Sequence, residues 1–541
     1  TGTAPCKTAC PAHIAVQGYL KLAAQGKYRE ALQLIKRENP FPAVCGRICN
    51  RRCEDACTRG TVDQAVAIDE VKRFIAQQDL DAATRFVPEK VIPKVDGAFD
   101  QQIAIIGGGP AGLSCAYYLA EKGYRPTVFE KERRLGGMLE NGLPSFRLEK
   151  DVVQAEIDVL REMGVQFRCG VEVGKDVTIA QLREQGYQGF YVAVGLQSGG
   201  RLNIPGDDAQ GVTAGIDFMR RVNGGQETKL EGRVVVIGGG NIAADVARTA
   251  VRCGAESVDL YCLESYDDMP MGPEDRGECE RDGITIHAGW GQTEIVTENG
   301  HAAGIRFRKC LRVKNDQGRF APEFDDNDTC QAQCAAVLYC IGQKVDWRQL
   351  LTGTAVTFNP NGTAQVDPVT YQTAEPGIFA GGDAVTGQKF AIDAIAAGKE
   401  GAISLHRFVQ KATLTIGRNR RQFVELDKEN ALIPVGFDNT PRQQIGYNEA
   451  LRRTFRDERI AFTAEQVQKE TARCLSCGAS VVDPNKCIGC GVCTTKCAFD
   501  AIHLHRERPE CTHMIPAEDK MKAILPYMVK REIKIRKAGK K

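Results

Sequence analysis

Cysteines gather at both ends of this chain, which holds 22 of them among 541 residues. Near the C-terminus Cys487, Cys490, Cys493 and Cys497 follow the spacing Cys-x2-Cys-x2-Cys-x3-Cys. Three thiolates on a tight loop and a fourth entering a helix can each bind a different iron atom of a cubane. The spacing therefore predicts a [4Fe-4S] cluster, although Ala498 stands where bacterial ferredoxins usually carry proline.

Further candidate ligands flank this loop. Cys474 and Cys477 form a Cys-x-x-Cys pair, and Cys511 follows later. They could ligate a second C-terminal [4Fe-4S] cluster, or they could join His513 in a four-ligand zinc site, for which these donors are chemically adequate. The cluster is favoured because zinc carries no electrons.

Six more cysteines lie near the N-terminus: Cys6, Cys10, Cys45, Cys49, Cys53 and Cys57. They stand among stretches such as residues 16–38, where apolar residues recur every three or four positions as in an amphipathic helix. This predicts a small helical domain with metal ligands in its turns. Six thiols complete one four-ligand cluster and leave two over, so a second cluster would need other ligands or a donor from elsewhere.

The composition excludes several classes of partner. The chain has 71 basic and 69 acidic residues, a net charge of +2, so neither nucleic acid nor an anionic membrane is expected as a partner. No stretch approaches the roughly 18 uninterrupted apolar residues of a membrane span, and the first residues lack the order of a signal peptide. Cysteines in metal-ligand spacings, rather than disulfide patterns, favour a reducing cytoplasm.

Residues 102–130 carry the pattern of a dinucleotide-binding turn. A strand leads to Gly107, Gly109 and Gly112, which allow a tight turn, a close approach of the backbone to pyrophosphate, and close packing of helix on strand. Pro110 and Ala111 complete the turn, whose helix N-terminus favours phosphate. Glu130 closes the second strand eighteen positions after Gly112, where a carboxylate can accept hydrogen bonds from ribose hydroxyls.

The pattern recurs in residues 233–264. Gly238, Gly240 and Ala243 repeat the three roles, with Asn241 in the turn. Two such units about 130 residues apart predict two dinucleotide-binding domains, the second a nicotinamide site. Glu264 lies twenty-one positions after Ala243, near where an acid accepts a ribose 2′-OH and repels a 2′-phosphate, so the local chemistry favours NADH.

A later segment, GIFAGGDAVTG at residues 377–387, resembles the late motif of FAD-dependent pyridine-nucleotide oxidoreductases. The resemblance implies that Asp383, after Gly382, holds the ribityl-phosphate region of the flavin, and hence that the first site binds FAD. Since the second turn lies between the first turn and this motif, one Rossmann domain is expected to be inserted into the other.

Six motifs together resemble the small-subunit flavoprotein family of NADPH-dependent glutamate synthase: CKTACPAHIAVQGYL, NPFPAVCGRICNRRCEDAC, GGGPAGLSCAYYLA, GGML, GGGNIAADVARTA and GGDA. Relatives of that family include the electron-bifurcating transhydrogenase large subunit and the N-terminal half of dihydropyrimidine dehydrogenase. The resemblance covers about residues 5 to 410. It implies two [4Fe-4S] clusters in the N-terminal domain, and places Gly137 of GGML and Arg147 of GLPSFRL near the flavin. Arg147 could equally be a surface residue after a turn.

Two features depart from this family. A further Cys-x-x-Cys usually stands just upstream of the position of Cys6, where this chain reads TGTA. NADPH-using relatives also place a basic pair where this chain has Cys262 and Leu263, so the family favours NADPH while the local residues favour NADH. Arg276, Arg248 or Arg252 could restore binding of the phosphate.

The expected architecture is α/β, with two Rossmann-type domains between iron–sulfur domains. The expected boundaries are 1–95 for the helical [4Fe-4S] domain, 96–210 with 345–420 for the FAD domain, 211–344 for the NAD(P) domain, 421–470 for a linker, and 471–541 for a ferredoxin-like domain with a basic tail.

These features predict an iron–sulfur flavoprotein that exchanges hydride between NAD(P)H and FAD and passes single electrons through [4Fe-4S] clusters. The expected partners are ferredoxin and the flavoprotein or iron–sulfur subunits of a bifurcating transhydrogenase, hydrogenase or formate dehydrogenase. The alternatives are a glutamate synthase small subunit and a non-catalytic electron-relay subunit. We nominate no catalytic side chain, because hydride transfer needs stacking of the two rings rather than an acid or base.

Overall fold

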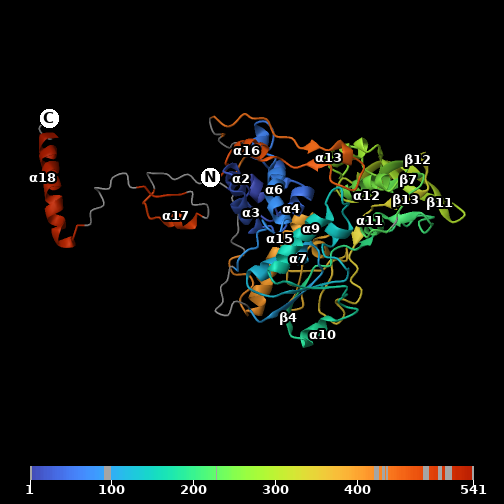
Figure 1. Cartoon of the computed structure of the whole chain (residues 1–541), viewed down its shortest axis with the longest axis horizontal. Helices are drawn as coiled ribbons and strands as arrows, with labels where there is room; N and C mark the ends of the chain where they lie inside the picture. Colours follow the sequence, from blue (N-terminus) through green and yellow to red (C-terminus); the bar gives the residue numbers. More distant parts are fainter. Residues whose placement is uncertain are drawn as a thin grey trace. The chain divides into compact units, whose positions relative to one another are not determined.

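The computed structural model describes residues 3–90, 99–226, 228–418, 426–428, 433, 436–478, 487–497, 502–505 and 515–538 (Figure 1). The chain divides into two compact units, Thr1–Ala479 and Ser480–Lys541. Cys511 and His513 lie outside the described residues, so the zinc site and the ligand role expected for them remain predictions.

The N-terminal part of the first unit is helical. Its elements are α1 (Pro5–Thr8), α2 (Val16–Ala24), α3 (Tyr28–Lys36), α4 (Pro42–Ile48), α5 (Arg52–Asp55), η1 (Thr58–Thr61), α6 (Ile68–Ala76) and η2 (Gln77–Leu80). Proline opens α1 and α4, where its fixed φ suits a first turn that has no hydrogen-bond partner for the N–H. The apolar residues of α3 recur at helical spacing and are buried, as the sequence predicts for residues 16–38, and those of α6 are buried in the same way.

The first Rossmann sheet has five parallel strands in the order β15-β4-β1-β2-β3. These are β1 (Gln102–Ile106), β2 (Thr127–Glu130), β3 (Gln166–Cys169), β4 (Tyr187–Val192) and β15 (Ile378–Ala380). The edge strand β15 comes from far along the chain and pairs with β4, Ile378 opposite Phe190. The last strand of this sheet is therefore contributed by a part of the chain that follows the second domain.

That second domain is a five-stranded parallel sheet in the order β6-β13-β7-β8-β9. Its strands are β6 (Val212–Ala214), β7 (Arg233–Ile237), β8 (Ser257–Cys262), β9 (Thr285–Ala288) and β13 (Ala336–Tyr339). An antiparallel sheet of β10 (Trp290–Glu298), β11 (His301–Lys314) and β12 (Phe320–Gln333) is added to it, and β5 (Ser198–Gly199) pairs with β14 (Gln343–Lys344) where the chain crosses between the domains. The predicted fold class, with one Rossmann domain inserted into the other, is confirmed.

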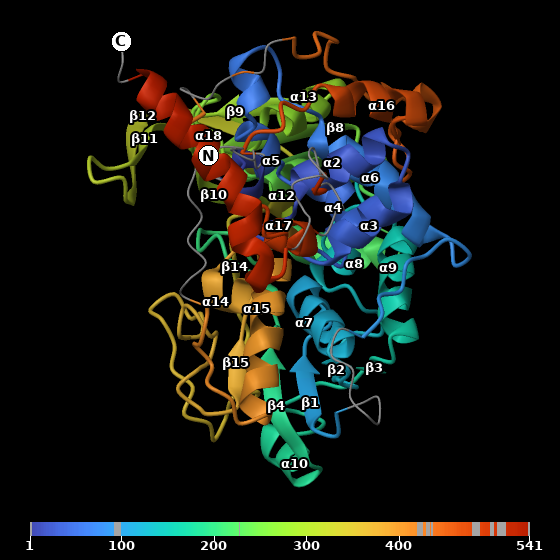
Figure 2. The same ribbon diagram turned by 90° about the vertical axis from the view of Figure 1, so that its left-hand side faces the viewer.

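Helices surround the two sheets. The first Rossmann domain has α7 (Pro110–Glu121), α8 (Met138–Asn141), α9 (Lys150–Glu162), α10 (Ile179–Glu184), α14 (Asp383–Thr386) and α15 (Ala391–Val409), and the second has α11 (Gly215–Asn223), α12 (Asn241–Arg252) and α13 (Pro273–Arg281). Figure 2 shows α7 and α15 together beside β1, β4 and β15.

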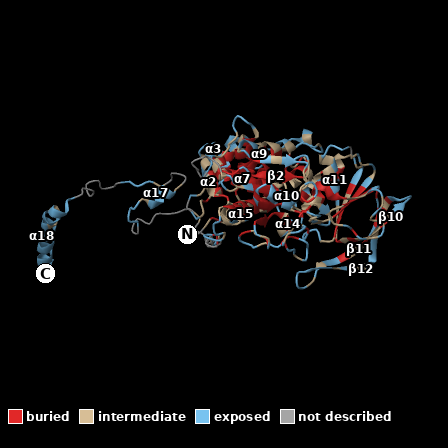
Figure 3. Ribbon diagram, turned by 90° about the horizontal axis from the view of Figure 1, so that it is seen from below, coloured by how far each residue is buried: buried red, intermediate tan, exposed pale blue. Residues whose placement is uncertain are grey.

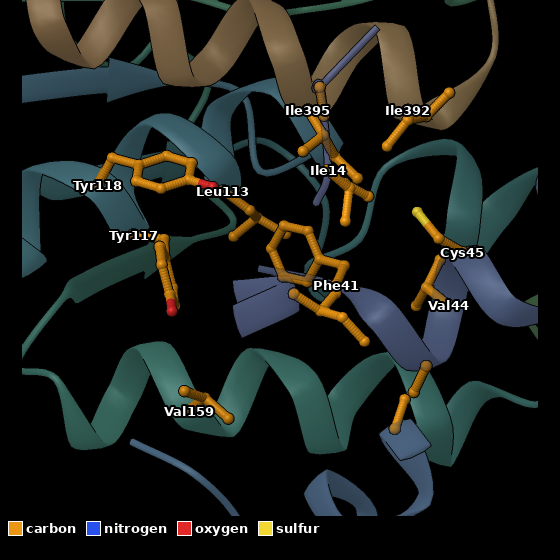
Figure 4. Packing of buried hydrophobic residues seen from close by; sticks show 14 of the residues in the cluster. Ile14, Phe41, Val44, Cys45, Leu113, Tyr117, Tyr118, Val159, Ile392 and Ile395 are labelled. Atoms are coloured by element: carbon orange, nitrogen blue, oxygen red, sulfur yellow. The ribbon is translucent and has the colours of Figure 1, made fainter. Parts of the chain in front are cut away.

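The N-terminal helical domain shares a hydrophobic core with the first Rossmann domain. Figure 4 shows Phe41 and Val44 of the N-terminal domain among Leu113 of α7, Val159 of α9 and Ile395 of α15. Residues around α7 and β2 are correspondingly buried in Figure 3. The cysteine-bearing turns are thereby held against the domain that carries the first glycine-rich turn.

The chain then returns to the N-terminal domain. Residues 436–478, the returning segment, contain β16 (Gly446–Tyr447), η3 (Glu449–Leu451), β17 (Arg459–Ile460) and α16 (Ala464–Ala472). Phe462 and Val467 are buried in the same core as the N-terminal helices, and Figures 1 and 2 show α16 beside α2. Much of the stretch expected to be a linker therefore packs on the N-terminal domain, and residues 471–478 belong to the first unit.

The described part of the second unit has α17 (Val492–Lys496), η5 (Ala517–Asp519) and α18 (Lys520–Ala538). The basic tail is helical, and its residues are exposed (Figure 3). Among the helices that the structure describes, none has the length and apolar character needed to cross a bilayer.

Candidate functional site

The first glycine-rich turn joins β1 to α7. Gly107 has a φ of +110°, and a Cβ there would lie 2.4 Å from the carbonyl oxygen of Ala193, so only glycine fits. A Cβ at Gly112 would lie 2.0 Å from the oxygen of Gly107, which requires glycine where the helix meets the strand. Gly109 has open space beside it and precedes α7, whose first N–H groups have no helical partner. The turn can therefore hold a phosphate.

Glu130 lies at the end of β2 beside this turn. Its Oε2 accepts a hydrogen bond from the Gly108 N–H at 2.7 Å, and its Oε1 accepts one from the Glu132 N–H at 2.9 Å. Burial raises the pKa of this carboxyl, and these two N–H groups oppose the rise. The structure thus places Glu130 where the sequence predicts an acceptor for ribose hydroxyls.

The second turn joins β7 to α12 with the same geometry. Gly238 has a φ of +140°, and a Cβ there would lie 2.7 Å from the carbonyl oxygen of Cys340. Gly240 has open space around it, and Ala243 is buried where α12 begins. Two similar phosphate-binding turns therefore lie within the first unit.

Glu264 relates to the second turn as Glu130 relates to the first. An added Cβ on Gly239 would lie 2.7 Å from Glu264 Oε2, and one on Gly108 would lie 3.1 Å from Glu130 Oε2. The carboxylate of Glu264 is thus close to the turn that would hold the second nucleotide.

The three arginines that could grip a 2′-phosphate differ in their partners. Arg248 and Arg252 are buried and pair with Asp282 at 2.8 and 2.7 Å, and both lie over the ring of Phe146. Arg276 lies over the Tyr266 ring on the loop after β8 and donates to the carbonyl oxygen of Tyr266. Of the three, Arg276 is the one that forms no ion pair with a carboxylate within the described residues, so it is the remaining candidate for a phosphate.

A cavity of about 810 Å³ joins the two turns. Of the predicted cofactor residues it is lined by Gly107, Gly109, Pro110, Ala111, Glu130, Gly137, Arg147, Gly240, Asn241, Ala243, Gly382 and Asp383. Gly112, Gly238 and Glu264 lie outside the lining, behind or beside the turns. One hollow thus holds surfaces for two nucleotides, as a transfer between them requires.

Asp383 begins α14 at the rim of this cavity. Burial raises the pKa of its carboxyl to about 6, and the Lys389 N–H hydrogen-bonds to it at 3.3 Å. Asp383 is half-buried and lines the cavity together with Ala111 and Gly382, so its carboxylate can accept hydrogen bonds from a bound ligand's hydroxyl groups.

Arg147 links the two Rossmann domains and is not a surface residue. It is paired with Asp245 of α12 at 2.6 Å and with Asp275 of α13 at 2.5 Å. Burial lowers its pKa, but these carboxylates hold that pKa above its usual value. Burial also raises the pKa of Asp245 to about 6. Arg147 therefore fixes one domain to the other at the edge of the cavity.

The N-terminal cysteines fall into two neighbourhoods. Cys45, Cys49 and Cys53 are each electrostatic neighbours of Lys72, which pairs with Asp69, and Cys10 is an electrostatic neighbour of Cys49. The other two thiols, Cys6 and Cys57, are neighbours of each other. Their further neighbours are Cys474 and Cys477 of the returning segment.

The N-terminal domain also reaches the cavity. Ile48 lines it and directly precedes Cys49, and Phe390 lines it beside Arg52. Arg52 is bound to Asp393 of α15 by two hydrogen bonds of 2.9 and 3.1 Å. The first neighbourhood of thiols therefore lies next to the cavity wall.

In the second unit Cys487 and Cys490 lie on a loop in which Gly489 and Gly491 adopt positive φ. Cys493 lies in α17 and Cys497 directly follows that helix, so the third cysteine enters a helix where the fourth was expected to. Among the described residues, no three His, Cys, Asp or Glu side chains approach closely enough to hold a single metal ion. A cubane spaces its thiolates more widely than one ion does, because each thiolate binds a different iron.

Sequence reasoning missed several of these residues. Asp393, Lys72, Asp69 and Arg459 lie outside every motif, and Arg52 lies within a cysteine motif that gives it no role. Arg459 donates to the carbonyl oxygens of Arg47 at 3.0 Å and Arg147 at 2.8 Å. The one signal available in the sequence was the number of cysteines. One four-ligand cluster leaves two of the six N-terminal thiols without a partner set, and the Cys-x-x-Cys pair at 474–477 would bring that number to four.

Comparison with known proteins identifies three matching families. Residues 101–398 match pyridine nucleotide-disulphide oxidoreductase, residues 1–84 match dihydropyrimidine dehydrogenase domain II with a 4Fe-4S cluster, and residues 480–503 match the 4Fe-4S binding domain.

Individual relatives support the same families. The NADP(+)-dependent formate dehydrogenase subunit beta of Moorella thermoacetica is 34% identical over 504 residues, which are 88% of this chain and 70% of that protein. The glutamate synthase [NADPH] small chain of Escherichia coli is 31% identical over 427 residues, 76% of this chain and 89% of that protein. FprA of Mycobacterium tuberculosis, solved in complex with NADPH, shares the fold with a TM-score of 0.50 at 17% identity, covering 58% of this chain and 85% of FprA.

Proposed function

Since the chain belongs to the pyridine nucleotide-disulphide oxidoreductase family, we propose that it is the flavin subunit of a larger complex, in which it links NAD(P)H to one-electron carriers. The chain is an NAD(P)H-dependent FAD and iron–sulfur oxidoreductase related to the glutamate synthase small subunit. The predicted resemblance, the enzyme class, and the FAD, NAD(P)H and [4Fe-4S] cofactors are thereby confirmed.

The residues of the first turn fit FAD. Gly109 and the start of α7 offer N–H groups to pyrophosphate, Glu130 offers a carboxylate to ribose, and Asp383 offers one farther along the cavity. Bound flavin accepts a hydride and releases single electrons, which is the conversion that a nicotinamide and a [4Fe-4S] cluster require. The protein's part is to align the two rings and exclude water.

One observation carries the proposal: the two turns open into the same cavity, and Ile48 of the cysteine-bearing domain lines its wall. A nicotinamide nucleotide on the second turn and a flavin on the first can therefore share one hollow. The thiols around Lys72 lie beside that wall, so we assign Cys10, Cys45, Cys49 and Cys53 to the cluster nearest the flavin.

Anaerobic titration of the purified chain with NADH and with NADPH tests this proposal. We expect the absorbance of FAD to bleach, followed by reduction of the clusters. Gly238→Val is a matched control, because its side chain collides with Cys340 in the second turn while the first turn is unchanged. The control should retain FAD and lose its reduction. An unreduced flavin in the wild-type chain would instead support the electron-relay alternative.

The partners are inferred from the relatives, two of which are named as subunits of larger enzymes. We propose iron–sulfur or flavoprotein subunits of a bifurcating transhydrogenase, hydrogenase or formate dehydrogenase, with ferredoxin as a further acceptor. The match at residues 480–503 supports this over a glutamate synthase small subunit, because it supplies an additional cluster domain. Co-purification and identification of bound subunits would decide between them.

A further inference from the structure

Two cysteine pairs from opposite ends of the sequence are held together in the first unit. Arg59 follows Cys57 by two positions, and Arg473 directly precedes Cys474. Arg59 Nη1 donates to the carbonyl oxygen of Arg473 at 3.1 Å, across 414 positions of chain. Both guanidinium groups are buried, and both bind Asp63. The turn after Cys57 and the residue before Cys474 are thus fixed to each other.

Arg473 adds further hydrogen bonds to the same turn. Its Nη2 donates to the carbonyl oxygen of Gln64 at 2.6 Å, and its Nη1 to that of Ala65 at 3.2 Å. Glu470, one turn earlier on α16, accepts from the Ala67 N–H at 2.8 Å and from Arg473 at 2.7 Å. Since Glu470 and Arg473 are fully buried, these contacts define the position of the returning segment.

Cys477 has its own contact with the N-terminal helices. The side-chain amide of Gln17 on α2 donates to the carbonyl oxygen of Cys477. Cys474 packs against the core that contains Cys6, and the thiols of Cys57, Cys474 and Cys477 are all electrostatic neighbours of Cys6. The four sulfurs therefore form one group.

The chemistry of this group fits an iron–sulfur cluster. All four donors are thiols, which suit Fe–S clusters. Burial raises the pKa of the Cys57 and Cys474 thiols, and nearby main-chain N–H groups, those of Val66 and Arg59 for Cys57 and that of Ser476 for Cys474, oppose the rise. Such N–H donors stabilise thiolates that carry charge.

We infer that Cys6, Cys57, Cys474 and Cys477 together ligate one [4Fe-4S] cluster, so that the returning segment completes the N-terminal iron–sulfur domain. This ligand set deepens the proposed function. It depends on that proposal only for the direction in which electrons flow through the cluster. It leaves Cys10, Cys45, Cys49 and Cys53 as the other N-terminal set and Cys487, Cys490, Cys493 and Cys497 as the C-terminal set. Twelve cysteines then form three complete sets, and the ligand pairing of Cys474 and Cys477 with Cys511 expected from sequence is replaced.

The test replaces Cys474 and Cys477 together by alanine in the full chain. Iron and acid-labile sulfide should each fall from about twelve to about eight atoms per chain. Cys169→Ala, at an exposed cysteine that ends β3, is the matched control and should leave both counts unchanged. FAD content and the reduction of FAD by NAD(P)H are measured on the same samples. If the wild-type chain contains no FAD, or if NAD(P)H does not reduce it, that result counts against the proposed function and not against this ligand set.

Native alkylation with iodoacetamide, followed by peptide mass spectrometry, identifies the ligands. In the double variant Cys6 and Cys57 should become reactive, while Cys10, Cys45, Cys49 and Cys53 stay protected. In Cys6→Ala, Cys474 and Cys477 should become reactive toward iodoacetamide. This variant provides the test if the double variant does not fold. The inference is overturned if iron is unchanged, if zinc is the metal lost, or if Cys511 becomes reactive while Cys6 and Cys57 stay protected.

Discussion

At the scale of single residues, coenzyme choice depends on the side chains that follow β8. A 2′-phosphate carries close to two negative charges and needs a basic partner, whereas a carboxylate accepts from a free 2′-OH and repels the phosphate. Glu264 lies beside Gly239, and Arg248 and Arg252 are engaged with Asp282. The local residues thus support NADH, although relatives are named for NADPH.

We predict that NADH reduces the FAD with the higher kcat/KM. Leu263→Arg combined with Glu264→Ser should move the preference toward NADPH by about 1–3 kcal/mol, the scale of hydrogen bonds to charged groups. Steady-state kinetics with both coenzymes measure this. A tenfold or greater preference of the wild type for NADPH would contradict the prediction, and Arg276→Ala would then be expected to abolish that preference.

Cys490 provides a second prediction at this scale. Cys490→Ser should remove one reducible cluster signal from the electron spin resonance spectrum and leave reduction of FAD by the nicotinamide coenzyme intact, because the loop belongs to the other unit. Cys169→Ala is again the control. An unchanged iron count would mean that this loop holds no cluster.

Spacing within a motif shows the local ligand sets but not those assembled by folding. The C-terminal loop and both glycine-rich turns were predictable, since each depends on residues within about 30 positions. The proximity of Cys474 to Cys6 depends on Arg59, Arg473 and Glu470, whose long-range contacts leave no periodic trace in the sequence. Arg147 shows the same limit, because its partners Asp245 and Asp275 lie on another domain.

At the scale of elements, α9 holds the start of α4. Both oxygens of Glu156 on α9 accept hydrogen bonds, from the Ala43 N–H at 2.7 Å and the Val44 N–H at 2.9 Å. These N–H groups lie in the first turn of α4, where a helix has no internal acceptors for them. Burial and, to a smaller extent, the nearby Asp79 raise the pKa of Glu156 to about 8, although these two N–H groups oppose the rise.

This pKa predicts a pH-dependent contribution of Glu156 to stability. The folded protein binds the proton more tightly than the unfolded chain, whose glutamate titrates at about 4.3. The contribution should therefore be complete at low pH and decline as pH rises from about 4.5 to 8. The wild type should therefore exceed Glu156→Gln in Tm by more at pH 5 than at pH 9. A gap that is constant or widens over this range would refute the assignment.

The elements themselves were largely predictable, and their partners were not. The helical periodicity of residues 16–38 and the strand–turn–helix order of both Rossmann units indicate the observed elements. The stretch 421–470 is polar and turn-rich, and it predicts a linker. Its described part nevertheless contains α16, because Val467, Glu470 and the adjoining Arg473 have buried partners in the N-terminal domain.

At the scale of the whole molecule, hydride chemistry and the C-terminal cluster belong to different units. A chain ending at Ala479 should retain FAD and its reduction by NAD(P)H, and should lose about four iron atoms and transfer to a one-electron acceptor. Absorbance titration, iron analysis and reduction of ferredoxin by the truncated and full chains measure this. Equal rates of ferredoxin reduction would show that electrons leave from the first unit.

The returning segment also affects how the protein is made. A ribosome that has just completed Arg59 must add the 414 residues up to Arg473 before the two can meet. At about 5–20 residues per second this takes roughly 20 to 80 s. During that interval the nascent N-terminal helices expose the apolar surface that Phe462 and Val467 later cover. Cys6 and Cys57 also lack Cys474 and Cys477, which have not yet been synthesised. Iron–sulfur assembly factors and chaperones thus have access to these thiols and this apolar surface throughout the interval.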